Sequence, residues 1–224
     1  MVNRFCNAGF GLLGLGVLLA SIGCGSGTAK LRVLNASPDE ANVEVLVDGT
    51  SIDNSLAFAA STGYVTVDSG SRHLQIEPAG STTYIVDQTL SLNTASQTTF
   101  LMTGYASSLT DLVLSDDITA STTSGVNLRL VNAAPSMGTA DVYVVTPGTV
   151  LSGTSPAVSG LAFGTASSYL SLSTGTYEIY FTEPGTTFPF VETGSIAFSA
   201  NQNRTLVALT ANGGFTTITL ADLN

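Results

Sequence analysis

Asn42-Val-Glu-Val-Leu-Val-Asp-Gly49 is a stretch in which valine occupies every second position before an Asp-Gly pair. A period of two puts Val43, Val45 and Val47 on one face of an extended strand, and Asp-Gly is typical of the tight turn that ends one. Residues 73–77 repeat the alternation with Leu and Ile. About seven such runs in each half of the chain, with a turn signal about every 8–12 residues, predict a β-sandwich of the immunoglobulin or transthyretin type.

The same motifs occur twice in the same order. Leu31-Arg-Val-Leu-Asn-Ala-Ser-Pro38 returns as Leu128-Arg-Leu-Val-Asn-Ala-Ala-Pro135, and Asn42–Gly49 is echoed by Asp141–Gly148. The copies are separated by about one domain length, so the sequence predicts an all-β protein with two tandem sandwich domains rather than a solenoid of short repeats.

These patterns divide the chain into five segments. We expect a separate N-terminal segment at residues 1–23, a flexible tether at 24–30, a first β-sandwich domain at 31–119, a linker at 120–126 and a second β-sandwich domain at 127–224. The linker is short and rich in Ser and Thr, which favours two domains that lie end to end with some freedom to hinge.

Composition argues against several classes of function. The 224 residues carry 6 Lys and Arg against 16 Asp and Glu, a formal net charge of −10. Phosphate binding needs a basic surface, so nucleic acid is not expected as a partner. One His and two Cys are too few for an all-protein zinc cluster, and they leave a Ser/His/Asp triad one candidate base. No cofactor is expected.

The first 23 residues have the layout of an export signal. Arg4 is the only charge among them, and a mostly apolar run follows from Ala8 to Ile22. The run is short for a membrane-spanning helix, which needs about 20 apolar residues, and it is followed by Gly23-Cys24. A small residue before Cys at this place resembles the bacterial lipoprotein signal, although Ser21 stands where such signals most often have Leu.

The resemblance implies that cleavage leaves Cys24 as the N-terminus, carrying fatty acyl chains such as palmitate that anchor it to a membrane. Cys6 lies in the segment that is removed, so Cys24 is the only thiol of the mature chain. An uncleaved N-terminal anchor and an ordinary signal that leaves a free thiol are the alternatives. Gly25 stands where Asp would favour retention at the inner membrane, so we expect the cell envelope, at the outer membrane or cell surface.

The motif that opens each copy resembles that of a bacterial and archaeal family, domain of unknown function 4397. Its members begin with an apolar-Arg-apolar strand, an Asn-Ala-Ser-Pro-Asp turn and a valine-rich strand that ends in Asp-Gly. Residues 31–49 fit this pattern closely, and residues 128–148 depart from it at Ala134, Ser136 and Thr146-Pro147. The resemblance implies an exported or surface-attached protein and brings no catalytic residues.

Arg32 and Arg129 occupy the same strand position in the two copies. We expect each to form a structural ion pair with a carboxylate, such as Asp48 in the first copy and Asp141 in the second. A ligand-binding role for the two arginines is the alternative.

His73 is the only histidine, and its counterpart in the second copy is Glu178, so the duplicated fold does not require a histidine there. No serine lies in a Gly-x-Ser-x-Gly motif. We therefore expect no catalytic, cofactor-binding or metal-binding residues, and we interpret the protein as a non-enzyme.

Two groups of residues suggest binding hypotheses. Carboxylates that could hold calcium near the junction or in the motif turns are Asp39, Glu40, Asp111, Asp116, Asp117 and Asp141. Aromatic side chains that could bind a sugar or a peptide are Tyr143, Tyr180, Phe188 and Phe190. The simpler interpretation is solvated turn and edge charge for the first group and packing for the second.

Together these patterns predict a lipid-anchored, non-catalytic protein of the cell envelope that acts as a binding or adhesion module. Its expected partners are the membrane, through the N-terminal lipid, and an envelope protein or a glycan. A structural spacer or scaffold is the alternative, and a hydrolase with an unrecognised site is the third hypothesis.

Overall fold

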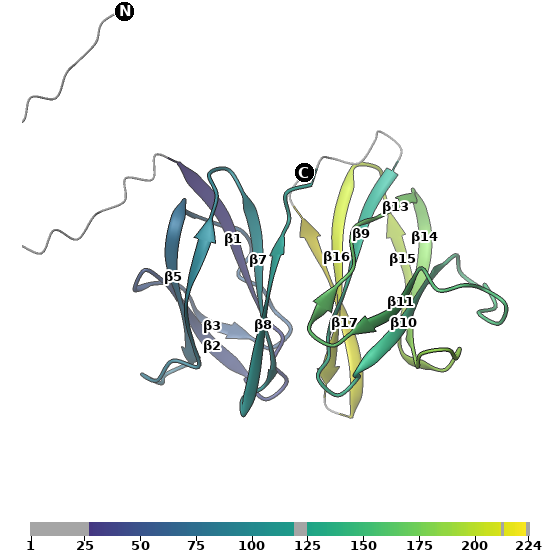
Figure 1. Cartoon of the computed structure of the whole chain (residues 1–224), viewed down its shortest axis with the longest axis horizontal. Coiled ribbons are helices and arrows are strands. Elements are labelled where there is room, and N and C mark those ends of the chain that lie inside the picture. The colour runs from purple at the N-terminus through teal and green to yellow at the C-terminus, as the bar shows by residue number, and fades with distance from the viewer. Residues whose placement is uncertain (1–26, 119–124, 212, 223–224) are drawn as a thin grey trace, which may run out of the picture.

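The computed structural model describes residues 27–118, 125–211 and 213–222, and these form two β-sandwiches that lie side by side (Figure 1). The described residues form strands and no helix, so the predicted all-β fold with tandem sandwich domains is confirmed. Across these three ranges there is accordingly no helix long and apolar enough to cross a membrane. The predicted signal peptide and Cys24 lie outside the described residues.

Domain 1 is built from two four-stranded sheets. Its strands are β1 (Thr28–Asn35), β2 (Asn42–Val47), β3 (Thr50–Ala57), β4 (Val65–Asp68), β5 (Gly70–Pro78), β6 (Val86–Leu92), β7 (Gln97–Tyr105) and β8 (Ser108–Ser115). One sheet has the order β4-β1-β7-β8 and the other the order β3-β2-β5-β6.

Domain 2 repeats this plan. Its strands are β9 (Gly125–Ala133), β10 (Thr139–Val145), β11 (Val158–Ala162), β12 (Thr165–Ala166), β13 (Leu170–Ser173), β14 (Gly175–Thr182), β15 (Pro189–Phe198), β16 (Gln202–Ala211) and β17 (Gly214–Asp222). One sheet has the order β12-β9-β16-β17, with β13 also paired to β9, and the other the order β11-β10-β14-β15.

The first strand of each domain pairs in parallel with the strand that comes next to last. Arg32 on β1 lies opposite Thr99 on β7, and Arg129 on β9 lies opposite Thr205 on β16. The other neighbouring strands pair antiparallel. This common register places equivalent residues of the two copies at equivalent points of the two domains.

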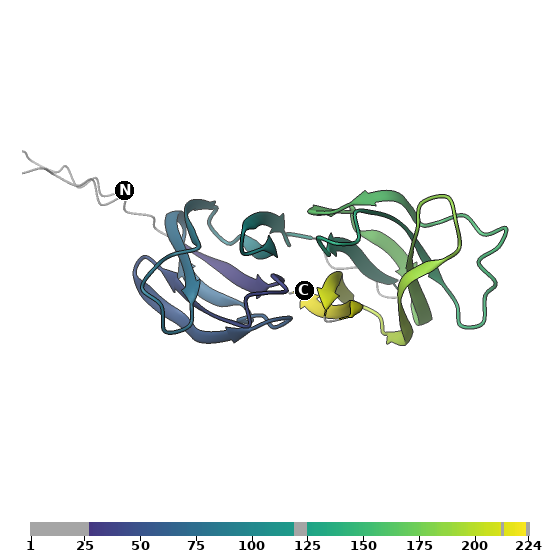
Figure 2. The ribbon, with the colours of Figure 1, turned by 90° about the horizontal axis from the view of Figure 1, so that it is seen from below.

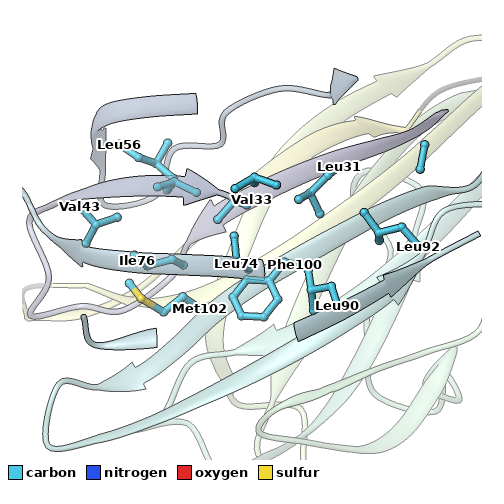
Figure 3. Packing of buried hydrophobic residues seen from close by; sticks show 13 residues of the cluster. Leu31, Val33, Val43, Leu56, Leu74, Ile76, Leu90, Leu92, Phe100 and Met102 are labelled. Carbon is cyan, nitrogen blue, oxygen red and sulfur yellow. The ribbon is translucent and has the colours of Figure 1, made fainter. Parts of the chain in front are cut away.

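Each sandwich has its own hydrophobic core between its two sheets. In domain 1 the valines of β2 that the sequence placed on one face are all buried. Leu74 and Ile76 lie beside them on the neighbouring strand β5, and Phe100 on β7 packs against this face from the other sheet (Figure 3). In domain 2 the corresponding core includes Val142 and Ile179. The period of two therefore predicted the inward faces correctly.

The predicted Asp-Gly turn joins β2 to β3. Val47 and Thr50 are register partners, so Asp48 and Gly49 alone form the turn, with φ angles of +50° and +75°. Two successive residues with positive φ are the geometry that favours Asp-Gly in a tight hairpin.

A third hydrophobic cluster joins the two domains. Domain 1 contributes Leu34, Ala36, Leu101 and Leu114, and domain 2 contributes Val131, Ala133, Val207, Leu209 and Leu220. These residues come from the sheets that contain β1 and β9, which face each other across the middle of the molecule (Figures 1 and 2). The expectation of domains that lie end to end with some freedom to hinge is therefore wrong.

The physical reason is that the central strands of these two sheets are buried on both faces. Leu31 and Val33 on β1 enter the domain 1 core, whereas Leu34 and Ala36 enter the cluster between the domains. A sheet buried on both sides carries near-continuous apolar runs in place of alternation. β1 also begins at Thr28, inside the expected tether, and β9 begins at Gly125, inside the expected linker.

Candidate functional site

Arg32 and Arg129 are deeply buried charges at equivalent positions of the two copies. Arg32 is 2% exposed on β1 and Arg129 is 4% exposed on β9. Neighbouring side chains on a strand point to opposite faces, so both arginines leave the core of their own sandwich and point toward the other domain. Both guanidinium groups therefore lie between the domains, beside the apolar cluster.

Each arginine binds an aspartate of the other domain. Nη2 of Arg32 donates to Oδ1 of Asp222 at 2.6 Å, and Nη1 donates to the carbonyl oxygen of Ala221 at 2.9 Å. In the opposite direction, Nη2 of Arg129 donates to Asp116, and Nη1 donates to the carbonyl oxygen of Ser115 at 2.8 Å. We call Arg32, Asp116, Arg129 and Asp222 the Arg–Asp network.

Asp116 connects the two halves of the network. Its second oxygen lies 3.6 Å from Nη2 of Arg32, within domain 1, while the first binds Arg129 of domain 2. Asp116 is 0% exposed and Asp222 is 4% exposed. Two positive and two negative groups thus balance one another away from solvent, which is the condition under which buried charges are tolerated.

Neutral side chains complete the hydrogen bonding of the network. Thr99 accepts a bond from Nε of Arg32 at 2.9 Å and donates to Asp116. Thr205 accepts from Nε of Arg129 at 3.0 Å and donates to Asp222 at 2.7 Å. Because the remaining donors and acceptors have partners, the cost of removing the charges from water is offset locally.

A tyrosine covers each guanidinium group. Tyr64 lies under Arg32, with the guanidinium carbon 4.4 Å from the ring centroid, and its hydroxyl donates to Asp116 at 2.7 Å. Tyr169 lies under Arg129 in the same way, with the guanidinium carbon 4.7 Å from the ring centroid, and its hydroxyl donates to Asp222 at 2.9 Å. Cation–π contacts of this kind favour a planar, weakly hydrated cation such as guanidinium.

Burial raises the pKa of both tyrosines well above the usual value. For Tyr64 the loss of hydration is the main cause, and Asp116 raises the pKa further while Arg32 opposes the shift. For Tyr169 burial again dominates, and the neighbouring Asp222 carboxylate raises the pKa while Arg129 lowers it. Both phenols therefore stay neutral donors to the carboxylates.

The interpretation of the two arginines as structural ion-pair residues is confirmed, but the suggested partners are wrong. Asp48 instead binds Arg72 at 2.9 Å and accepts a bond from the backbone N–H of His73. Asp141 accepts bonds from the backbone N–H groups of Gly160 and Gly185. The arginines point away from their own sandwich core, so carboxylates at the ends of β8 and β17 reach them.

His73 lies on the solvent-exposed face of β5 and pairs with Asp87 on β6. Asp87 also lines an open groove of about 200 Å³ between β6 and β8, with Asp111 on the opposite wall. This groove is shallow and mixed in character, and it is separate from the Arg–Asp network.

The acidic residues considered for calcium do not converge. Asp116 is held by Arg129 and Tyr64, whereas Asp117 accepts a bond from the backbone N–H of Gln97. Among the described residues no group of three or more His, Cys, Asp and Glu side chains is arranged to hold a metal ion. Asp39 accepts a bond from the backbone N–H of Ala106.

The aromatic residues divide between packing and exposure. Tyr143 and Tyr180 are register partners on β10 and β14, so they share one sheet face, and Tyr143 is only 5% exposed. The Tyr180 hydroxyl donates to Glu178 at 2.8 Å, which lowers the pKa of that carboxyl. Phe190 packs edge-on against Phe215.

Phe188 is the exception among these aromatic residues. It lies between β14 and β15 and is 73% exposed. Patches of exposed apolar side chains are typical of binding surfaces, whereas single exposed apolar residues such as this one are common on any protein.

Sequence reasoning missed Asp222 as a site residue and gave Asp116 a different role. The available signal was the repeat itself, because Leu114-Ser-Asp116 is echoed by Leu220-Ala-Asp222 at the end of the second copy. Tyr64 and Tyr169 are likewise equivalent, as are the threonines beside each arginine. These shared polar residues lie at the junction between the two copies.

The family profile described as Domain of unknown function (DUF4397) matches residues 29–143 and 145–224. The chain belongs to this family. The matched segments contain both arginines and both aspartates of the Arg–Asp network, so the site lies in the part of the chain that defines membership. No curated protein matches the sequence.

Several solved structures resemble the chain at low sequence identity. One is a family 26 carbohydrate-binding module from Eubacterium rectale Amy13K in complex with maltoheptaose, at 13% identity and a TM-score of 0.26, covering 84% of this chain and 96% of that one. Another is the Bacillus anthracis TIE protein, at 11% identity and a TM-score of 0.28, and the match covers 83% of this chain and 34% of that one. A third is an α-glucan-binding streptococcal virulence factor, at 6% identity and a TM-score of 0.27, and the match covers 80% of this chain and 93% of that one.

Replacement of Asp116 tests the network directly. Asp116→Ala should lower the free energy of unfolding by about 3–5 kcal/mol, because it leaves the buried guanidinium of Arg129 without its charged partner. Asp111→Ala, on the exposed part of β8, is the control and should change it by about 0.5 kcal/mol or less. Denaturant unfolding followed by circular dichroism measures both, and equal effects would contradict the structural role of Asp116.

The raised pKa of Tyr64 and Tyr169 predicts a loss of stability in alkali. The pKa of each phenol is about 10 in the unfolded chain and higher in the folded protein. Its contribution to the free energy of unfolding is therefore complete below pH ~10 and is lost as the pH rises further. At least two of the seven tyrosines should therefore resist ionisation in an ultraviolet titration until the protein unfolds.

The double variant Tyr64→Phe/Tyr169→Phe should show a flatter decline of stability above pH ~10. Tyr105→Phe, which alters an exposed phenol, is the control and should keep the wild-type decline. Ionisation of all seven tyrosines together in protein that is still folded would refute the burial argument.

Proposed function

We propose that the protein is a lipid-anchored, non-catalytic component of the cell envelope that binds a partner with a rigid two-domain body. The observation that carries this proposal is the closure of the Arg–Asp network. Buried charges with perturbed neighbours are the usual candidates for reactive groups. Here they bind each other across the domain boundary, and tyrosine rings cover them.

The histidine supports the same proposal. His73 is exposed and pairs with a single carboxylate, and its equivalent in domain 2, Glu178, instead binds Tyr180 and Ser195. Equivalent positions of the two domains thus carry different side chains with different partners. Such a difference is expected of a variable surface and not of a reactive centre that both copies share. A glycan or an envelope protein is the kind of partner that we propose.

The N-terminal sequence supports the anchor. Only Gly25, Ser26 and Gly27 lie between Cys24 and the start of β1 at Thr28. An extended chain covers about 3.3–3.6 Å per residue, so a lipid on Cys24 would hold domain 1 within roughly 15 Å of the membrane surface.

A structural spacer is the second candidate, and the joined domains favour it. The apolar cluster and the Arg–Asp network together make the two sandwiches one body, which suits a part that sets a distance. The two functions differ in whether a soluble form of the protein retains a partner.

The anchor is tested by metabolic labelling with a fatty-acid analogue. Wild-type protein should incorporate the label and remain with membranes, whereas Cys24→Ser should lose both, because the acyl chains need the Cys24 thiol. Cys6→Ser is the matched control and should behave as wild type, since that residue lies in the segment to be removed. Labelled Cys24→Ser protein would show that the anchor is misassigned.

The non-catalytic character is tested with His73→Ala. We expect this variant to fold and to complement any envelope phenotype of a deletion strain fully, because the other copy of the domain has Glu178 at this position. Circular dichroism verifies the fold and the phenotype reports function. A folded His73→Ala protein that fails to complement would contradict the proposal.

A further inference from the structure

The polar contacts between the domains occur in pairs that are related by exchange of the two domains. Arg32 binds Asp222 and the carbonyl group of the preceding residue. In the same way, Arg129 binds Asp116 and the carbonyl group of the residue that precedes Asp116. The residue under each guanidinium is a tyrosine of the same domain. An interface in which the same patch occurs on both sides is the kind that a two-fold symmetric dimer has.

Each domain therefore carries both halves of the contact. Domain 1 alone presents a guanidinium donor at Arg32, and 3.6 Å from it the carboxylate acceptor of Asp116. If a second copy of domain 1 took the place of domain 2, its Asp116 would stand where Asp222 stands. Domain 2 likewise presents Arg129 and Asp222.

The apolar residues match in the same way. Ala36 is equivalent to Ala133 and Leu114 to Leu220, while Leu34 and Leu101 of domain 1 are replaced by valines in domain 2. Domain 1 in turn has the smaller Thr103 where domain 2 has Leu209, so the total side-chain volume of a pair of identical domains nearly matches that of domain 1 with domain 2, and only the local packing differs. These differences favour the pairing of domain 1 with domain 2, which we call the mixed pair. Two copies of the same domain, a like pair, remain complementary in charge.

One contact departs from the symmetry. The hydroxyl of Thr103 donates to the carbonyl oxygen of Ala133 across the junction at 2.7 Å, and the equivalent position in domain 2 is Leu209, which has no donor. A like pair of domain 1 copies would keep this bond twice, and a like pair of domain 2 copies would lack it.

From these observations we propose that the junction surface of each domain is self-complementary and binds a second copy of the same domain when pairing within the chain is prevented. The partner that this surface fits is thus another copy of this chain. In the wild-type protein the linked domain has a high effective concentration, which keeps the pairing internal. Breaking only the internal pairing should convert the chain from a monomer to an assembly of two or more chains.

Exchange of charges within one domain does this selectively. In Arg32→Asp/Asp116→Arg the new carboxylate faces Asp222 and the new guanidinium faces Arg129, so the internal junction meets like charges. The same exchange leaves two copies of domain 1 complementary, and domain 2 is unchanged. Within domain 1 the two exchanged residues remain an oppositely charged pair.

The matched control exchanges the charges in both domains. Adding Arg129→Asp/Asp222→Arg to the first pair restores opposite charges at the internal junction with reversed polarity. We expect the wild type and this fourfold variant to be monomers by light scattering at equal protein concentration. The twofold variant should have at least twice the monomer mass, and a folded twofold variant that stays monomeric would overturn the proposal.

A measurement on the wild-type junction decides the question if the twofold variant does not fold. A protease site inserted at residues 120–124 allows the folded chain to be cut, after which native mass spectrometry identifies which halves associate. We expect pairs of two N-terminal halves and pairs of two C-terminal halves beside the mixed pair. Mixed pairs alone, or free halves alone, would overturn the proposal.

Discussion

The reciprocal pairing of Arg32 with Asp222 and of Arg129 with Asp116 is the constraint on which the rest of the structure depends. Each domain has a buried arginine whose direct carboxylate partner is supplied by the other domain. Isolated buried charges are strongly unfavourable, so separation of the sandwiches would expose or strand four of them together with an apolar sheet face. Two repeats that could each enclose a core are thereby joined into one body.

The network also decides how the apolar surface is divided. In both domains the sheet that contains the first strand has side chains buried on each face, one set in the sandwich core and the other between the domains. Hydrophobic burial supplies most of the attraction but little direction. The paired charges, the bonds to backbone carbonyl groups and the tyrosines under the guanidinium groups fix the orientation, because a shifted arrangement would leave buried donors unsatisfied.

The duplication explains why such a junction exists. Equivalent residues of two copies related by an approximate two-fold exchange meet twice, so one favourable contact in a repeat becomes two contacts in the tandem protein. The arrangement leaves the opposite sheets, with His73 in domain 1 and Tyr180 in domain 2, free of the junction. Surface chemistry can differ there between copies without disturbing the fold, as the difference between His73 and Glu178 illustrates.

By itself the sequence determined that the protein is all-β, that it contains two copies of one sandwich, and which valines of β2 face inward, because strand periodicity and turn chemistry are local properties. It also indicated that Arg32 and Arg129 form structural ion pairs. Only the tertiary structure decided their partners, since the carboxylates that the sequence suggested, Asp48 and Asp141, are taken by other groups. The junction itself was decided there too, because the contact of Arg32 with Asp222 joins positions at opposite ends of the described chain, and no local pattern encodes a distance of that kind.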